Sequence, residues 1–266
     1  MLEEWTCQTT PMRKRLIDWV VTIPFLACFG LVLLAFDLPQ RVARLFGSRP
    51  QEIVAGALQV ALVWAFRLTG ARISIERSPL VLPHESYLIL ANHQSLFDIP
   101  ILGAELFTNY PKYVAKRELA RWLPSISYNL RRGGNALIER GDRSQATEAI
   151  RELGVTAARR GVSAVLYPEG TRARKGNLGP FKRAGTFALM EAAPDTPIVP
   201  AVIDGSWRLL RFNLFPVPFG TEIRVRFGDP IARSPDEDRS ALLAQVREEL
   251  SETLDSWREE KTLTES

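Results

Sequence analysis

Residues 87–98 read YLILANHQSLFD, a short apolar run that leads into a polar turn. Six further short runs lie between residues 72 and 227, and several carry apolar side chains at consecutive positions, as strands do when both faces of their sheet are covered. Stretches with helical periodicity, such as 144–159 and 181–192, alternate with these runs. The pattern therefore predicts an α/β domain with a mixed, largely parallel sheet flanked by helices. The expected strands are residues 72–76, 87–91, 113–115, 136–139, 164–167, 198–203 and 222–227.

A helix is predicted at the C-terminal end of the chain. Ser234 supplies a cap side chain, Pro235 suits a first turn, and the two acids that follow suit the positive end of a helix dipole. Leucine and valine then recur at every fourth position from residue 242 to residue 254, with charged residues on the other faces. This stripe predicts a surface helix that packs against the domain.

The N-terminal part of the chain is apolar. Residues 19–36 carry no charge, and a helix of this length spans roughly 27 Å. Pro24 argues against a straight helix, and the residues that follow offer no signal-peptide cleavage site. Residues 53–66 form a second apolar stretch, interrupted by Gln59. We expect residues 1–70 to form a membrane-anchoring helical region, as a spanning anchor or as a hairpin in one leaflet; alternatively, the second stretch is a buried helix of the domain.

The composition excludes several classes of protein. The chain has 266 residues, of which 46% are hydrophobic and 24% charged, as in an ordinary globular protein. Because its two cysteines, Cys7 and Cys28, both lie in the N-terminal part, neither a disulfide framework nor a zinc site is expected. The net charge of +4 favours anionic partners. Since the chain has no zinc-finger or RNP motif, we expect phospholipid rather than nucleic acid.

The polar turn after residues 87–91 contains His93 and Asp98. Ligands bind at the carboxyl ends of strands in open α/β sheets, and an imidazole accepts a proton from a hydroxyl when a carboxylate fixes its tautomer. Residues five apart do not share a helix face. The two side chains therefore meet only if a turn separates them and Asp98 lies in the first turn of the next helix, where the dipole favours it. The alternative is that Asn92 or Asp98 caps a helix and His93 is a surface residue.

A second polar turn, residues 168–172, reads PEGTR and also follows an apolar run. Arg172 offers a planar guanidinium that suits phosphate, and Gly170 permits close approach of the backbone. Taken by itself, the turn fits anion binding and solvated surface equally well. Lys116 and Arg140 likewise follow expected strands, but taken singly each is better explained by a surface salt bridge.

Four ordered blocks of the chain resemble the lysophosphatidic acid acyltransferases, the 1-acyl-glycerol-3-phosphate acyltransferase family. The chain is similar to this family in the His-x4-Asp block at 92–98, the glycine-led strand at 134–140, the Pro-Glu-Gly-Thr-Arg block at 168–172 and the proline-containing apolar strand at 198–203. KREL at 116–119 and FKRAG at 181–185 are similar as well, the latter with one extra residue before its glycine. Ala173 stands where many members carry serine.

This resemblance implies a glycerolipid acyltransferase-like fold for residues 71–266. It also implies direct transfer of a fatty acyl group to the sn-2 hydroxyl of 1-acyl-glycerol-3-phosphate, which makes phosphatidic acid. His93 would be the general base and Asp98 would orient it. A further set of residues would bind the acceptor or shape its phosphate site: Lys116, Arg140, Glu169, Gly170, Thr171 and Arg172.

The resemblance also sets the expected partners. Acyl-CoA or an acyl-carrier protein is the expected donor, and neither a metal nor a cofactor is required. We expect the enzyme to be associated with a membrane, on the cytoplasmic face of a bacterial inner membrane. Its partners would be the bilayer, the lysophospholipid and the acyl donor, without nucleic acid.

Other functions remain open at this point. The alternative acceptors are glycerol-3-phosphate, a lyso-ornithine lipid and another lysophospholipid. The same basic turn would also serve a non-catalytic membrane protein that binds anionic lipid independently of His93. A nucleotide-binding Rossmann-type domain fits poorly, because the chain lacks both G-x-G-x-x-G and G-x4-G-K-[ST].

Overall fold

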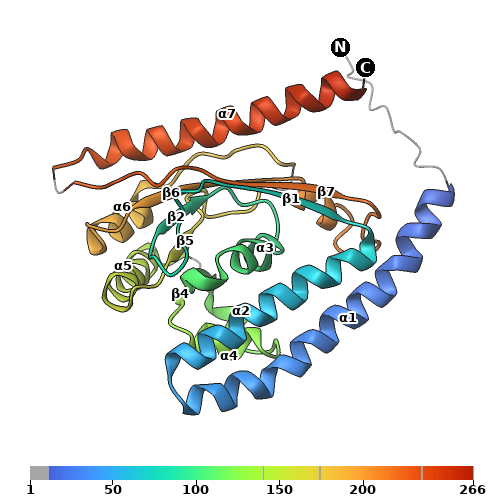
Figure 1. Cartoon of the computed structure of the whole chain (residues 1–266), viewed down its shortest axis with the longest axis horizontal. Helices are drawn as coiled ribbons and strands as arrows, with labels where there is room; N and C mark the ends of the chain where they lie inside the picture. The colour runs from blue at the N-terminus through green and yellow to red at the C-terminus, as the bar shows by residue number, and fades with distance from the viewer. Residues whose placement is uncertain (1–11, 140, 174, 235, 266) are drawn as a thin grey trace.

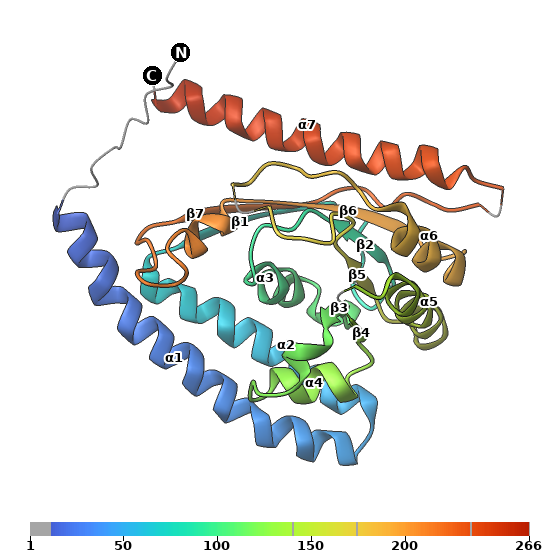
Figure 2. The same cartoon turned by 180° about the vertical axis from the view of Figure 1, so that it is seen from behind.

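The strand within residues 87–98 belongs to a sheet that lies between two layers of helices in the computed structural model (Figures 1 and 2). The structure describes residues 12–139, 141–173, 175–234 and 236–265. The seven predicted strands are all present: β1 (Arg72–Arg77), β2 (Leu88–Ala91), β3 (Lys112–Lys116), β4 (Ala136–Ile138), β5 (Ala164–Leu166), β6 (Ile198–Asp204) and β7 (Glu222–Phe227). The α-helices are α1 (Met12–Leu45), α2 (Ser48–Ala65), α3 (Asp98–Glu105), α4 (Ile126–Arg132), α5 (Arg143–Arg160), α6 (Arg183–Ala192) and α7 (Arg239–Glu265). Short 3-10 helices are η1 (Phe66–Thr69), η2 (Phe107–Asn109), η3 (Arg117–Ala120) and η4 (Ser206–Leu210).

The strands form one sheet in the order β1-β7-β6-β2-β5-β3-β4. Five neighbouring strands, from β6 to β4 in this order, run parallel, whereas β7 pairs antiparallel with β6 and carries β1 parallel to itself. The predicted mixed, largely parallel sheet is confirmed. Because the five strands point the same way, the turns that follow them open at one edge of the sheet, which we call the carboxyl edge.

Strand β2 contributes to two separate cores because its side chains alternate between the faces of the sheet. Ile89 and Ala91 pack with residues of α1, α2, α3 and η1. Leu88 and Leu90 pack with residues of α5, α6 and α7. All four side chains are fully buried, which explains why the strand reads as an uninterrupted apolar run. In Figure 1, α7 lies above the sheet, and α3 and α2 lie below it.

Helices α1 and α2 form a hairpin along the lower side of the molecule in Figure 1. By length and composition alone, Arg15–Leu45 and Ser48–Thr69 are apolar enough to cross a membrane. Of the most apolar 18-residue stretch in each, 17% is buried within the protein in the first segment and 44% in the second. The two apolar helices pack together, as the hairpin alternative expects, and their role as a membrane anchor remains a prediction. Since α2 also packs against α3, it combines the roles of hairpin partner and domain helix. The boundary expected at residue 70 remains a prediction.

The C-terminal helix begins later than predicted. Helix α7 starts at Arg239, so the predicted cap at Ser234 is wrong. The carboxylate of Glu237 accepts hydrogen bonds from the Arg233 side chain (2.7 Å) and the Ser234 backbone amide (3.2 Å). These bonds hold the segment before α7 in a turn of its own. The predicted stripe between residues 242 and 254 is confirmed, because its leucine and valine side chains are buried in the core beneath α7.

Candidate active site

His93 and Asp98 lie on the connection between β2 and α3. Strand β2 ends at Ala91, α3 begins at Asp98, and residues 92–97 join them. Nδ1 of His93 lies 2.8 Å from Oδ2 of Asp98. The geometry that the five-residue spacing requires is therefore present, with the histidine before the helix and the aspartate in its first turn. The same position places the carboxylate at the positive end of the α3 dipole.

The carboxylate of Asp98 is fully buried and accepts five hydrogen bonds. The donors are Nδ1 of His93, the amides of Gln94 and Ser95, and the hydroxyls of Ser95 and Ser206, at 2.5–3.3 Å. Because an ionised carboxylate only accepts, Nδ1 of His93 carries the proton of their shared bond, and the lone pair of Nε2 is free. Apart from His93, all of these donors are neutral groups.

Tyr167 supports the ring of His93. The two rings stack with their centroids 4.1 Å apart and their planes 18° apart, which restricts rotation of the imidazole. The His93 side chain is still 17% exposed, so it is held in place but remains accessible. Burial raises the pKa of the Tyr167 phenol far above its ordinary value, and the nearby Asp98 charge raises it further. Tyr167 therefore contributes an aromatic face rather than a proton.

The backbone of His93 is held by the turn that follows β5. The Glu169 carboxylate accepts hydrogen bonds from the amides of His93 (2.8 Å) and Gly179 (2.7 Å). The carbonyl of His93 accepts a hydrogen bond from the Ala173 amide at 2.7 Å. Burial raises the pKa of the Glu169 carboxyl, while the two amides oppose the rise. Glu169, which the sequence placed in the acceptor site, thus makes its contacts to the backbone that positions His93.

Two supporting residues were missed as site residues by sequence reasoning. The Asn92 amide group donates to the carbonyl of Ile203 and accepts from its N–H, both at 2.8 Å, so it ties the turn after β2 to β6. Ser206, two residues past the end of β6, donates to Asp98 at 2.5 Å. Ser206 carries a weaker form of the signal that identified the other turns, since it is a polar residue shortly after an apolar strand. The sequence offers Asn92 as a helix cap and as the first residue of the 92–98 block, but its bonds to Ile203 depend on a distant strand.

The basic turn after β5 adjoins His93. Gly170, Thr171 and Arg172 are exposed, and Arg172 directly precedes the residue that donates to the His93 carbonyl. Among the described residues, none forms a hydrogen bond or ion pair with the Arg172 side chain. The guanidinium is therefore available to an anion. Gly170 has φ +65°, and a Cβ there would lie 2.8 Å from Nζ of Lys182, so the glycine permits a second cation to lie across the turn.

Lys116 and Arg140 were expected at neighbouring strand ends. Lys116 is the last residue of β3. Tyr113 of β3 pairs with Val165 of β5, so three residues further along the two parallel strands Lys116 lies beside Pro168. The structure thus brings Lys116 to the carboxyl edge beside the basic turn. Arg140 lies outside the described residues.

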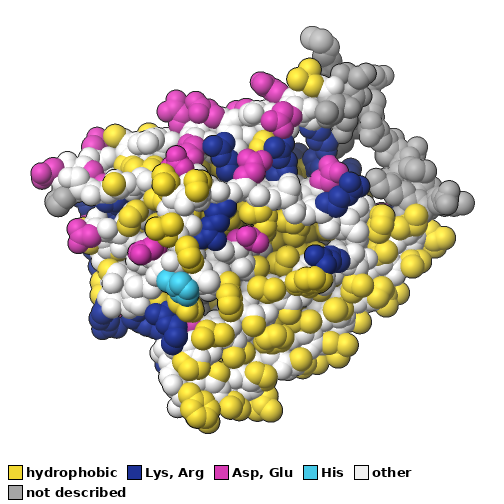
Figure 3. Space-filling model, viewed as in Figure 1, with side chains coloured by type: hydrophobic (Ala, Val, Ile, Leu, Met, Phe, Trp, Pro, Cys, Tyr) yellow, Lys and Arg dark blue, Asp and Glu magenta, His cyan; other side chains and the backbone are white. Residues whose placement is uncertain are grey.

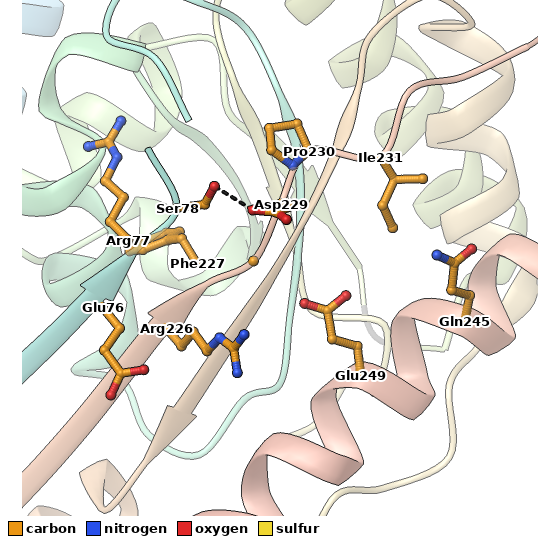
Figure 4. Close-up of a pocket in the computed structure, with 11 residues that line it drawn as sticks. Glu76, Arg77, Ser78, Arg226, Phe227, Asp229, Pro230, Ile231, Gln245 and Glu249 are labelled. Carbon is orange, nitrogen blue, oxygen red and sulfur yellow. Dashed lines mark hydrogen bonds between the residues drawn. The ribbon is translucent and has the colours of Figure 1, made fainter. Parts of the chain in front are cut away.

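A hollow of about 590 Å³ lies at the opposite edge of the sheet, between the end of β7 and α7 (Figure 4). Its lining includes Arg226, Asp229 and Glu249, and Asp229 accepts a hydrogen bond from Ser78 at 2.6 Å. Because β7 runs antiparallel to β6, this hollow is separated from the carboxyl edge by the length of the strands. None of the predicted site residues lines it. Among the described residues, no three His, Cys, Asp or Glu side chains are grouped as metal ligands would be.

The sequence matches the acyltransferase family model over residues 72–204. This chain belongs to the acyltransferase family. It is 31% identical over 197 residues to a 1-acyl-sn-glycerol-3-phosphate acyltransferase of Cocos nucifera, covering 73% of this chain and 59% of that one. It is 33% identical over 147 residues to the alpha form of that enzyme in Mus musculus (55% and 50% covered) and 30% identical over 132 residues to that of Escherichia coli (48% and 52% covered). The matches thus span about half the length of these relatives.

A solved structure shares the fold. The crystal structure of PlsC, the 1-acyl-sn-glycerophosphate (LPA) acyltransferase of Thermotoga maritima, superposes with a TM-score of 0.75 at 19% identity, covering 92% of this acyltransferase and 98% of PlsC. The predicted fold is confirmed, and so is the family resemblance predicted from the four blocks. The catalytic and binding roles of the individual residues remain predictions.

Proposed function

We propose that this acyltransferase moves a fatty acyl group from acyl-CoA or an acyl-carrier protein to the sn-2 hydroxyl of 1-acyl-glycerol-3-phosphate, forming phosphatidic acid. The observation that carries the proposal is the 2.8 Å contact between Nδ1 of His93 and the buried carboxylate of Asp98, which leaves Nε2 free as a base. Relatives named as 1-acyl-sn-glycerol-3-phosphate acyltransferases support this substrate class.

In the proposed reaction, Nε2 of His93 takes the proton of the acceptor hydroxyl as the hydroxyl oxygen attacks the thioester carbonyl. The C–O bond of the new ester forms, the C–S bond breaks, and the departing thiolate takes the proton from His93. No covalent acyl-enzyme forms. The buried Asp98 charge stabilises the imidazolium, and fixing both substrates beside the base contributes about 7–11 kcal/mol.

Two amides in the turn between β2 and α3 are not available for the tetrahedral oxyanion. The N–H groups of Gln94 and Ser95 already donate to Asp98, at 2.7 and 2.9 Å. These two N–H groups therefore cannot also bind the oxyanion. Other donors around the carboxyl edge must provide this stabilisation.

The acceptor phosphate is proposed to bind at the basic turn. Arg172 is exposed, and its side chain forms no hydrogen bond or ion pair with a described residue; Lys116 lies at the end of the neighbouring strand. Gly170 and Thr171 shape the turn that precedes Arg172. A guanidinium forms two parallel hydrogen bonds with phosphate oxygens, which favours an acceptor that carries a phosphate.

The proposal is tested by replacing the base. His93→Ala should lower acyl transfer to lysophosphatidate by roughly 10²–10⁴-fold, because general base catalysis is lost, without changing the circular dichroism spectrum. His84→Asn is the matched control, since His84 lies on a loop away from the carboxyl edge and its φ of 66° suits asparagine. Substantial activity in purified His93→Ala would refute the assignment of the base.

The acceptor is tested by replacing Arg172. Arg172→Ala should raise the KM for lysophosphatidate roughly 10–100-fold, because a charged hydrogen bond to the phosphate is lost. The KM for acceptors without a phosphate should rise less. Arg247→Ala, on the exposed face of α7, is the matched control. It removes one positive charge outside the basic turn and should leave the KM unchanged. A change in kcat alone would argue against a phosphate contact in the ground state.

We also propose that the enzyme lies on the cytoplasmic surface of a membrane, with α1 in the plane of one leaflet. Apolar side chains gather over α1 and α2 (Figure 3). Helix α1 is bonded to the domain at two positions along its length: Thr22 accepts from the Val217 amide at 2.8 Å, and Asp37 accepts from the Ser125 amide at 2.7 Å. A helix held along its length in this way cannot cross the bilayer without leaving the domain.

Cysteine labelling distinguishes this placement from a spanning anchor. Phe46→Cys, in the turn between α1 and α2, is made in a chain that lacks Cys7 and Cys28. An impermeant thiol reagent should label it from the same side of sealed vesicles as Ser240→Cys on α7. Labelling of the two positions from opposite sides would show a spanning helix.

A further inference from the structure

A groove of about 370 Å³ lies where the second half of α1 meets the segment between η3 and α4. Helix α1 contributes Leu34, Leu38 and Arg41, and the other wall contributes Arg121 and Trp122 among others. The two walls are tied together, because Ser125 donates to the Leu33 carbonyl at 2.5 Å and to Asp37 at 2.7 Å. The groove is therefore a fixed feature of the fold rather than a gap between loose segments.

The charges of the groove favour an anion. Arg41, Arg121 and Arg131 line it, opposed by the single carboxylate of Asp37. Arg41 is paired with Asp37 at 2.7 Å, and Arg131 donates to the carbonyl of Ala120. Arg121 is exposed, and no described residue forms a hydrogen bond or ion pair with it. The groove thus offers a guanidinium whose hydrogen-bonding groups are still available, and its lining keeps an excess of positive charge because one carboxylate offsets only one of the three arginines.

The remaining lining is apolar and exposed. Trp122 is 88% exposed, and Leu34 and Leu38 of α1 are 61% and 67% exposed. Leu34 and Leu38 belong to α1, the helix that the proposed placement sets into the leaflet. Tryptophan prefers the level of the lipid headgroups, where an aromatic body and a polar N–H are both satisfied. A phospholipid has a charged phosphate next to apolar acyl chains. The groove has the same arrangement, with an arginine next to an apolar surface.

We propose that this groove binds the headgroup of an anionic phospholipid of the bilayer, with Arg121 on the phosphate and Trp122 beside the first part of the acyl chains. The inference rests on the proposed membrane-surface placement. It assigns the segment from Arg121 to Tyr128 as a second membrane contact beside α1. Since η3 follows Lys116 directly, a lipid held here keeps the carboxyl edge close to the headgroup layer that supplies the acceptor.

Vesicle binding tests the proposal. The full chain is sedimented with phosphatidylcholine vesicles that contain or lack phosphatidylglycerol. Arg121→Gln should weaken binding to the anionic vesicles roughly fivefold, the effect of one cation near a charged surface, and leave binding to neutral vesicles unchanged. Trp122→Ser should weaken binding to both kinds of vesicle. Arg247→Gln on α7 removes the same net charge and should have no comparable effect.

Three results would overturn the groove as a lipid site. The first is equal binding of the unmodified chain to neutral and anionic vesicles. The second is an equal loss with Arg121→Gln and Arg247→Gln, which would show attraction by net charge alone. The third is a loss of turnover by Arg121→Gln on lysophosphatidate in neutral detergent, which would place Arg121 in the reaction. Absence of acyl transfer by the unmodified chain in that detergent assay would refute the proposed function alone.

Discussion

Asp98 and Glu52 are both buried carboxylates with several partners, yet their surroundings differ in charge. Asp98 is surrounded by neutral donors and one histidine. Glu52 on α2 contacts three cations: Lys112 at 2.8 Å, Arg49 at 3.2 Å, and Arg160. Both side chains lie in the protein interior, so burial alone does not distinguish a candidate catalytic carboxylate from a structural one.

The two carboxylates differ in how strongly each can attract a further positive charge. Neutral donors stabilise the Asp98 carboxylate without cancelling its charge, so an imidazolium on His93 gains the full attraction. The charge of Glu52 is already balanced by its cations, which come from α2, β3 and α5. Glu52 therefore joins the α1–α2 hairpin to the sheet and to α5, as a buried ion network does when every member has a partner.

The largest expected effect comes from Asp98→Asn. The amide cannot accept all five hydrogen bonds, and the tautomer of His93 is no longer fixed. We expect kcat to fall roughly 10²–10⁴-fold, together with a loss of stability that thermal unfolding measures. Ser206→Ala removes one neutral donor and should cost far less activity. Equal losses from the two variants would mean that the charge of Asp98 is not what matters.

Glu52→Gln tests the other carboxylate. It leaves Lys112 and Arg160 without their common counter-charge, and breaking a buried ion pair costs about 3–5 kcal/mol of unfolding free energy. Urea titration measures this loss. At a temperature where the variant is folded, kcat should change little, since Glu52 is not part of the carboxyl edge. A large fall in kcat with unchanged stability would reverse the distinction between the two sites.

The smallest effect is the pH dependence of the Glu52 network. Burial lowers the pKa of Lys112 to about 8; Glu52 opposes this change, and Arg160 and Arg49 add to it. The unfolded chain then binds more protons than the folded chain between about pH 8 and the ordinary pKa of 10.5. The contribution of Lys112 to the unfolding free energy therefore rises with pH in this window, by up to roughly 3 kcal/mol. Lys112→Met should remove the rise in urea titrations across that range; a rise of the same size in the variant would exclude Lys112 as its source.

Much of the carboxyl edge could be predicted from the sequence because its signals are local. A strand that is covered on both faces must be apolar at consecutive positions, so residues 87–91 reveal where the strand ends and the turn begins. The spacing of His93 and Asp98 then allows contact only across a turn, and the structure has that turn. The start of α7 was predicted wrongly because the Ser234 amide bonds to Glu237 in a turn before the helix.

Other features were decided only by the tertiary structure. Asn92 bonds to Ile203 on β6, Ser206 reaches Asp98 from the end of that strand, and Tyr167 stacks on His93. Each pair depends on which strands are neighbours in the sheet. Apolar periodicity specifies that a segment is a strand, but it does not specify the order of strands.

By itself, the sequence determined the seven strands, the polar turns at their ends and the family, since these follow from short-range patterns and ordered motifs. Only the tertiary structure decided that Asp98 has neutral donors whereas Glu52 has cations. Glu52 meets an arginine 108 residues further along the chain, and Asp98 meets a serine at the same separation. Contacts at this separation are set by the packing of helices on the sheet and by strand order, which no local periodicity encodes.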